Sequence, residues 1–532
     1  MAENYLWWRD GIIYQIYPRS FADTNDDGIG DLQGITARLD YLADLGIDAI
    51  WLSPIYPSPD EDFGYDVADY KNIDPKFGTL EDYDHLVAEA HDRGIRVILD
   101  LVLNHSSSQH PWFQESRKSK DNPFRDYYIW RDPAPGGKVP NNWQSVFGGP
   151  AWELDPQTGQ YYYHMFYKGQ PDLNWRNPAV RQEMLDVFRF WADRGTDGFR
   201  LDVFNMFFKD DQFRSNPLSL GIRGFDQQRH VYDCDRPEMV DLIKEIRTIL
   251  DGYPERYAVG ETFLGTTKAA FYSGDDLLHA AFNFDLLHGS FSIPRFSEAI
   301  QRWEKATSGK TWPVQVLNNH DTKRTASKWV HGEKDDRLKL LAAMLLTIRG
   351  TPFLYYGEEI GMRDIHVSRS MIKDPIGKRY WPFSVGRDGC RAPMQWNQEK
   401  NAGFSKGDPW LPVHPDFKFR NVDAQKADPN SLYHFYQKLI HLRKEHEALR
   451  GGMYQPLTFE PRFVLAFLRQ TADETILVAM NSSRRPMRLF LGGNLARSSW
   501  DLLLSSHREE VPDTSRGYIW LSSNEVVILK QK

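Results

Sequence analysis

The sequence predicts an α/β fold: a (β/α)8 (TIM) barrel with an inserted lid and a small C-terminal antiparallel β-domain. The chain has 532 residues, a length that suits an elaborated barrel better than one minimal domain. Eight short apolar runs alternate with helical patterns along most of it, as parallel strands and their connecting helices do. Polar and acidic residues follow several of these runs, at the strand ends where such barrels keep their chemistry.

The composition is that of a globular protein with a large core. Hydrophobic residues make up 41% and charged residues 26%, and no apolar run is long enough to cross a membrane. The formal net charge of −8, without a long basic run, argues against nucleic acids and anionic membrane surfaces as partners. The aromatic content of 14% is compatible with a sugar ligand, although aromatic residues also fill cores.

Two features bear on the cellular compartment. The N-terminal residues show no basic segment followed by an apolar run, so we expect no secretory signal. The two cysteines, Cys234 and Cys390, provide neither a disulfide framework nor a zinc motif, which suits a reducing environment. We therefore predict a cytoplasmic protein, and leave open whether it is a monomer or a dimer.

The first predicted strand, residues 12–17, leads into an acidic loop at residues 23–31. Side-chain oxygens at alternate positions and Gly28 match the first part of an EF-hand calcium loop. Gly34 stands where that loop needs a bidentate glutamate, so we do not expect an EF-hand. We predict a structural Ca²⁺, with Mg²⁺ or a metal-free Asx turn as alternatives, and the ligands Asp23, Asn25, Asp27 and Asp31 with the Ile29 carbonyl.

The remaining barrel elements follow in order. Helical patterns at 35–45 and 80–93 precede apolar runs at 49–54 and 95–102. The rhythm then breaks between residues 105 and 175, which are rich in Pro, Gly, Asn and aromatics and predict an irregular lid that walls the site. Further helices are expected at 180–194 and 431–449, and further strands at 197–202, 257–261, 281–285, 314–321 and 353–357.

The chain after Gly451-Gly452 changes character. Short alternating runs separated by polar turns predict an antiparallel β-domain that packs on the barrel. We therefore divide the chain into a barrel (1–104 and 176–451), a lid (105–175) and a β-domain (452–532).

Four motifs at the strand ends resemble the α-amylase family of glycoside hydrolases. They are DLVLNH at residues 100–105, GFRLD at 198–202, Glu261, and NHD at 319–321. The strings QPDLNW at 170–175 and GRDGCRAPMQW at 386–396 resemble the exo-acting α-glucosidase and oligo-1,6-glucosidase branch. Ala392 stands where many members of that branch have Thr, a change that we expect to be local.

The resemblance implies a catalytic role for three carboxyl groups. Cleaving an acetal with retention needs an ionised carboxylate and a protonated acid, about 5 to 5.5 Å apart. Asp202 would be the nucleophile, with Arg200 lowering its pKa and fixing its orientation. Glu261 would be the acid/base, its pKa raised by an apolar wall and by the charge of Asp202. Asp321 would bind sugar hydroxyls in the transition state, with His320 and His105 as hydrogen-bonding neighbours.

The resemblance also implies a pocket for one glucose unit. Asp62 would bind hydroxyls at the non-reducing end and Tyr65 would stack on the ring. Arg387, or alternatively Arg391, would pair with Asp62 and block extension beyond one sugar. Phe147 and Phe166 are candidate wall residues, with simple core packing as the alternative.

These features predict a retaining, exo-acting α-glucosidase that hydrolyses small α-glucosides. In this branch Val after the nucleophile accompanies α-1,6 linkages and Thr accompanies α-1,4, so Val203 favours isomaltose-type substrates. The alternatives are an α-1,4-specific enzyme and a transglycosylase such as sucrose isomerase or trehalose synthase. A non-catalytic binding protein is disfavoured because all three carboxyl groups are present.

Overall fold

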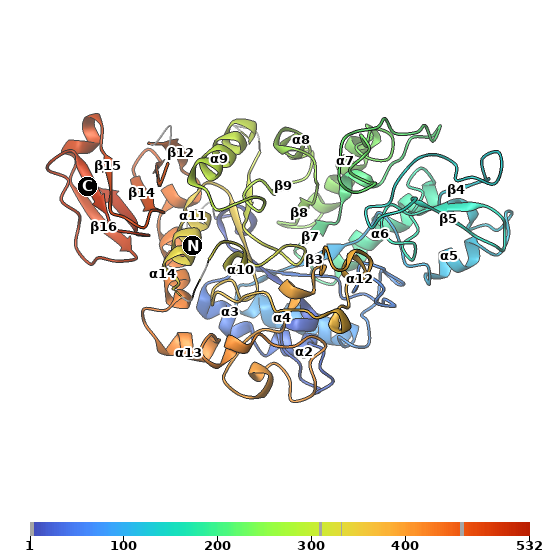
Figure 1. Ribbon diagram of the computed structural model, residues 1–532, viewed down its shortest axis with the longest axis horizontal. Helices are drawn as coiled ribbons and strands as arrows, with labels where there is room; N and C mark the ends of the chain where they lie inside the picture. The colour runs from blue at the N-terminus through green and yellow to red at the C-terminus, as the bar shows by residue number, and fades with distance from the viewer. Residues whose placement is uncertain (1–4, 308–310, 331, 333, 458–461) are drawn as a thin grey trace.

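A computed structural model of the protein describes residues 5–307, 311–330, 332, 334–457 and 462–532. Its centre is a closed barrel of eight parallel strands in the order β1-β11-β10-β9-β8-β7-β3-β2 (Figure 1). This arrangement confirms the predicted fold class. The strands are β1 (Ile13–Ile16), β2 (Ala49–Leu52), β3 (Arg96–Leu101), β7 (Gly198–Leu201), β8 (Tyr257–Gly260), β9 (Ala280–Asn283), β10 (Val314–Val316) and β11 (Thr351–Tyr355).

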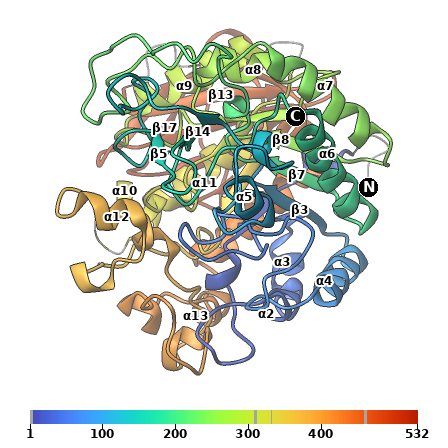
Figure 2. The same cartoon turned by 90° about the vertical axis from the view of Figure 1, so that its right-hand side faces the viewer.

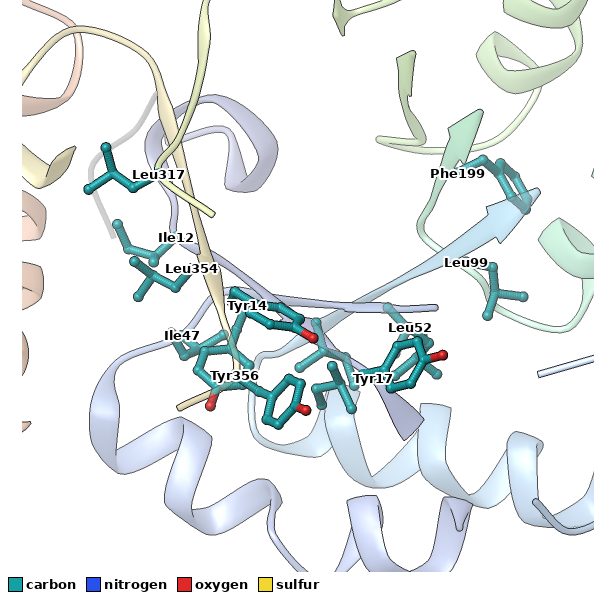
Figure 3. Close-up of a cluster of buried hydrophobic side chains, with 14 of the residues drawn as sticks. Ile12, Tyr14, Tyr17, Ile47, Leu52, Leu99, Phe199, Leu317, Leu354 and Tyr356 are labelled. Carbon is teal, nitrogen blue, oxygen red and sulfur yellow. The ribbon is translucent and has the colours of Figure 1, made fainter. Parts of the chain in front are cut away.

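Successive side chains of each barrel strand enter two different layers of the core. Ile13 and Trp51 point into the barrel and belong to one apolar cluster. Tyr14 and Leu52, one residue further along each strand, belong to the layer between strands and helices, which Figure 3 shows with Leu99, Phe199 and Leu354. Because both faces of each strand are buried, its sequence is a largely continuous apolar run. The strands could be predicted from these runs.

Helices cover the outside of the barrel. The longer ones are α4 (Leu80–Asp92), α6 (Pro178–Asp193), α7 (Glu238–Asp251), α9 (Ile293–Thr307), α11 (Asp336–Thr347) and α14 (Leu432–Glu445). The shorter ones are α1 (Trp7–Asp10), α2 (Leu32–Thr36), α3 (Leu39–Leu45), α8 (Thr266–Phe271), α10 (Thr325–Trp329), α12 (Pro375–Tyr380), α13 (Val422–Ala427) and α15 (Glu447–Arg450).

Two predicted helices differ from the structure. The helix expected at 35–45 is divided into α2 and α3, and α2 begins earlier because Asp31 caps it by accepting a hydrogen bond from the Gly34 backbone. The helix expected at 431–449 is likewise divided, because the backbone is extended at His446 between α14 and α15.

The segment between β3 and α6 contains α5 (Pro111–Ser116) and a small antiparallel sheet in the order β4-β6-β5. Its strands, β4 (Trp130–Arg131), β5 (Trp152–Leu154) and β6 (Tyr161–Tyr163), are too short to stand out in a sequence, so the segment read as irregular. The buried Lys209 ammonium ties this lid to the barrel. It lies 2.6 Å from Asp172 in the lid and donates to the Asn104 side chain after β3 (2.9 Å) and to the Met206 carbonyl.

The C-terminal β-domain lies at the opposite end of the molecule from the lid (Figure 1). One sheet has the order β12-β13-β14-β18-β16 and a second pairs β15 with β17. The strands are β12 (Met453–Pro456), β13 (Val464–Gln470), β14 (Thr475–Asn481), β15 (Met487–Phe490), β16 (Trp500–Ser505), β17 (Tyr518–Leu521) and β18 (Val526–Gln531). The buried Arg469 of β13 donates hydrogen bonds to the Gly452 carbonyl (2.9 Å) and to the Thr347 carbonyl of the barrel.

No helix in the described ranges combines the length and the apolar character that a membrane span requires.

Candidate active site

The register of three neighbouring strands brings the acidic residues together. Asp100 on β3 stands beside Arg200 on β7, and Arg200 stands beside Val259 on β8. Asp202 and Glu261 follow directly at the carboxyl ends of β7 and β8. Because parallel strands end at the same edge, these side chains meet at the mouth of the barrel.

Arg200 connects three carboxyl groups. One guanidinium nitrogen, Nη1, donates to Asp100 at 2.6 Å and to Asp202 at 2.7 Å. The other, Nη2, donates to Glu261 at 2.5 Å. The Arg200 side chain is only 1% exposed, so its orientation is fixed and both carboxyl groups of the candidate catalytic pair are held against the same rigid group.

Burial raises the pKa of both members of this pair. The pKa of Glu261 rises to about 8, since burial and the neighbouring Asp202 charge outweigh Arg200. Burial also raises the pKa of Asp202, to about 7, against the lowering effect of Arg200. The expected low pKa of Asp202 was therefore wrong, because the desolvation of a buried carboxylate exceeds the attraction of one shared arginine. The pKa of Glu261 lies above that of Asp202, so Glu261 is the more readily protonated member of the pair.

His320 and Asp321 lie beside this pair. The Gln15 amide donates to His320 Nδ1 (2.8 Å), so Nε2 carries the hydrogen and lies 2.7 Å from the Tyr65 hydroxyl and 3.2 Å from Asp321. Burial lowers the pKa of His320 to about 3, which keeps the ring neutral. Burial opposes ionisation of Asp321, but the guanidinium groups of Arg387, Arg391 and Arg200 help to hold the pKa of this carboxyl well below its usual range.

The two candidate arginines take different partners. Arg387 lies 2.5 Å from Asp62, 2.7 Å from Asp374 and 3.3 Å from Asp321. Arg391 pairs with Asp321 at 3.0 Å and donates to the His320 carbonyl. Asp62 is thus bound to Arg387, the preferred alternative of the two.

Tyr65 and His105 occupy the space between Asp62 and the catalytic pair. The Tyr65 ring stacks on His320, with 5.3 Å between the centroids, and its hydroxyl donates to Asp100 at 3.0 Å. His105 donates through Nε2 to the Tyr65 carbonyl at 2.9 Å, and burial lowers the His105 pKa to about 4. Both histidines are therefore neutral hydrogen-bonding groups.

Phe147, Phe166 and Val203 belong to one buried apolar cluster. The Phe166 ring lies 5.2 Å from His105, and the Phe147 ring centroid lies 5.6 Å from the Arg387 guanidinium carbon. The two rings therefore pack as core residues while also bordering the polar cluster. Val203 has a φ of 37°, in the left-handed region that β-branched residues seldom adopt, so the chain turns sharply just after Asp202.

Several polar residues around Arg200 and Arg387 were not assigned a role from the sequence. Asp100 and Gln170 lie inside strings that were recognised only as motifs. The Gln170 amide donates to Asp62 (3.2 Å) and to the Tyr65 carbonyl (3.0 Å), and so joins the lid to the candidate sugar-binding carboxylate. Asp374 had no signal in the sequence, because its position depends on the path of a long loop.

The acidic loop at residues 23–31 is stabilised by its own backbone. Asp23 accepts hydrogen bonds from Asn25, Asp26 and Gly28, while Asn25 and Asp27 accept from the backbone two residues on. Asp31 is turned towards Thr24 and the start of α2. In the described part of the chain, no three His, Cys, Asp or Glu side chains are grouped so that they could hold a metal. The arrangement is that of an Asx-rich turn, and calcium binding there stays a prediction.

Comparisons with known proteins agree with this geometry. A model of the α-amylase catalytic domain matches residues 15–452. The chain belongs to the α-amylase family. It is 44% identical to a probable alpha-glucosidase of Rhizobium meliloti (strain 1021), covering 90% of this chain and 89% of the relative. It is 42% identical to the oligo-1,6-glucosidase of Parageobacillus thermoglucosidasius, over 94% and 95% of the two chains.

Solved structures of this family share the whole architecture. The crystal structure of the alpha-glucosyl transfer enzyme XgtA has a TM-score of 0.94 and 39% identity, and covers 99% of this chain and 100% of its own. As a member of the α-amylase family, the chain is a glycoside hydrolase.

Proposed function

We propose that the protein is a retaining, exo-acting α-glucosidase that releases terminal glucose from the non-reducing end of short α-linked oligosaccharides. The observation that carries this proposal is the pair Asp202 and Glu261, which end neighbouring strands and both bind Arg200, with the pKa of Glu261 above that of Asp202. Double displacement at an acetal carbon requires two neighbouring carboxyl groups, of which one loses its proton more readily than the other.

The proposed reaction has two displacements. In the first, Asp202 attacks the anomeric carbon while Glu261 donates its proton to the glycosidic oxygen, so that the aglycone departs as an alcohol. In the second, ionised Glu261 takes a proton from water, and the resulting oxygen attacks the same carbon and releases Asp202. The configuration is inverted twice and therefore retained. Replacing Asp202 by Asn should abolish turnover while the protein stays folded, and retained hydrolysis would refute the nucleophile assignment.

The ion pair between Asp62 and Arg387 supports the exo action. The Asp62 carboxylate is buried, the Arg387 side chain is 13% exposed, and the two lie 2.5 Å apart, so a sugar chain could not continue between them without breaking the pair. We assign Asp62, Asp321, His105 and His320 to the hydroxyls of a single glucose. Asp62, His105 and His320 are buried hydrogen-bonding groups, and Asp321, whose side chain is 32% exposed, lies 3.2 Å from His320.

For the linkage we propose α-1,6. Val203 after the nucleophile and the similarity to an oligo-1,6-glucosidase support it. The similarity to an alpha-glucosyl transfer enzyme specifically favours a second candidate, in which a sugar hydroxyl replaces water in the second displacement. Rates on isomaltose, maltose and sucrose, with product stereochemistry by NMR, test both. A clear preference for maltose would refute the α-1,6 assignment, and transfer products at low substrate concentration would favour the transferase.

We also propose a cytoplasmic location and a Ca²⁺ ion in the loop at residues 23–31. Both cysteines are free and buried, which is compatible with a reducing compartment. The alternating oxygens of Asp23, Asn25 and Asp27 support the ion. Chelation should lower the melting temperature of the wild-type protein but not that of a D23N/D27N variant. Equal melting temperatures with and without chelator would leave the loop a metal-free turn.

A further inference from the structure

Asp374 is a fully buried carboxylate that binds the same arginine as Asp62, Arg387. Its Oδ2 accepts hydrogen bonds from the Arg387 backbone at 2.6 Å and from Nε at 3.1 Å. Its Oδ1 accepts from Nη2 at 2.7 Å. Because one carboxylate accepts all three hydrogen bonds, it fixes both the backbone and the guanidinium group of Arg387.

The same guanidinium reaches the candidate sugar-binding carboxylates. Nη2 also donates to Asp62 at 2.5 Å, and Nη1 lies 3.3 Å from Asp321. The Arg387 guanidinium therefore binds Asp374 through Nε and Nη2 while the same Nη2 also holds Asp62 and Nη1 faces Asp321.

The local backbone is built for this contact. Gly386, just before Arg387, has a φ of 74°, and a Cβ there would lie 2.3 Å from Asp374 Oδ2. Only glycine lets the chain pass so close to the carboxylate. Asp374 also accepts a hydrogen bond from the Ile376 backbone (3.3 Å) and so begins α12.

A groove of about 780 Å³ is lined by residues that neighbour Asp62 and Asp374 in the chain. Asp60 and Glu61, next to Asp62 in the chain, line one part of it, and Pro375, next to Asp374, lines another. Phe147, whose ring faces Arg387, lines the groove as well. The groove is large enough for a sugar unit.

We infer that Asp374 is a positioning residue that holds Arg387 across the closed end of the glucose pocket and keeps the substrate out of this groove. The inference rests on the proposed function and extends it, since it names the residue that limits the pocket to one glucose. Without Asp374, Arg387 is free to leave Asp62, and a longer chain can enter the groove.

The test compares D374N with D388N. Asp388 is a buried carboxylate of the same loop. It accepts hydrogen bonds from the Lys373 and Asp374 backbones, whereas the Arg387 guanidinium pairs with Asp62, Asp321 and Asp374. With p-nitrophenyl α-D-glucoside, D374N should raise KM about tenfold, the effect of one lost charge-assisted hydrogen bond, while kcat changes much less. D374E, which restores the charge, should recover part of this loss, and D388N should leave KM unchanged.

The second readout is the product formed from p-nitrophenyl α-maltoside. Wild type and D388N should release glucose from the non-reducing end, whereas D374N should also release maltose, because both sugars then fit ahead of the cleaved bond. Absence of maltose from the D374N reaction overturns the inference, whatever happens to KM.

A failure of the proposed function would look different. In that case wild type would hydrolyse no α-glucoside, and a crystal structure of D374N would decide the inference instead. Arg387 displaced from Asp62 supports it, and an unmoved Arg387 overturns it.

Discussion

Asp202 and Glu261 both carry a carboxyl group, and their different positions in the fold give these groups different pKa values. Both are buried and bound to Arg200, but the pKa of Glu261, about 8, exceeds that of Asp202, about 7. Near neutral pH one of the two groups is therefore ionised and the other protonated, and the two titrate as a coupled pair.

The activity should accordingly have a narrow pH optimum. As the pH rises through about 7, Asp202 loses its proton and kcat/KM rises; as it rises through about 8, Glu261 loses its proton and kcat/KM falls. We expect a bell-shaped profile for isomaltose with its maximum between these values. A flat profile up to pH 9 would contradict the assignment of Glu261 as the acid.

In E261Q, the fall of kcat/KM at high pH should disappear, because the group that loses its proton there is gone. Its kcat on isomaltose should fall by about 10² to 10⁴, the usual contribution of a positioned general acid. The first step on p-nitrophenyl α-D-glucoside should be less affected, since p-nitrophenolate leaves without a proton. A burst of p-nitrophenol in stopped-flow measurements checks this, and equal losses on both substrates would argue against the acid role.

V203T should change the linkage preference without changing the backbone. Val203 is 3% exposed and packs with Phe147 and Phe166, and Thr is also β-branched, so both residues share the strain of the left-handed φ. We expect the isomaltose-to-maltose ratio of kcat/KM to fall by up to about tenfold, the range of a single side-chain change in a pocket. V203A, which adds no hydroxyl, is the control. An unchanged ratio in V203T would contradict the role of this residue.

At the scale of elements, the barrel strands could be predicted and the lid sheet could not. Runs such as residues 95–102 are apolar on both faces and end at polar residues, so burial leaves a continuous signal. The two- and three-residue strands of the lid leave none. The same difference applies to the candidate site. Asp202 and Glu261 could be predicted because they follow apolar strands, whereas Asp374 lies in a loop whose path depends on tertiary contacts.

Lys209 joins the lid to the barrel, and its removal should loosen the lid. In K209M the buried Asp172 keeps its charge but loses its cation, a change that typically costs about 3 to 5 kcal/mol. We expect a lower melting temperature and faster proteolysis within residues 105–175. Lys168, an exposed lysine of the same lid, gives the control variant K168M. Identical proteolysis of K209M and K168M would show that the lid is held by other contacts.

At the scale of the whole molecule, the β-domain is attached to the barrel far from the candidate active site. Figure 2, which turns the lid side towards the viewer, shows the lid and the α12 loop in front of the barrel and the β-domain behind it. Arg469 is part of this attachment, since it donates to carbonyls of both units.

R469M should therefore lower stability without altering the chemistry. Several buried carbonyls lose their donor, and each unsatisfied group costs about 1 to 3 kcal/mol. We expect a lower melting temperature with kcat and KM close to wild type at 25 °C. R497M, at an exposed arginine of the same domain, is the control. A large change in KM for R469M would contradict the separation of the two units.

The network around Arg200 and Arg387 contains more acids than bases. Among the described residues, the carboxyl groups of Asp62, Asp100, Asp202, Glu261, Asp321 and Asp374 pair with three guanidinium groups, those of Arg200, Arg387 and Arg391. Even with Glu261 protonated, negative charge remains in excess in a buried space. A small hydroxylated amine, protonated and of the size of a sugar ring, should therefore bind more tightly than glucose. Amine buffers should act as competitive inhibitors, and assays in phosphate should give lower apparent KM values.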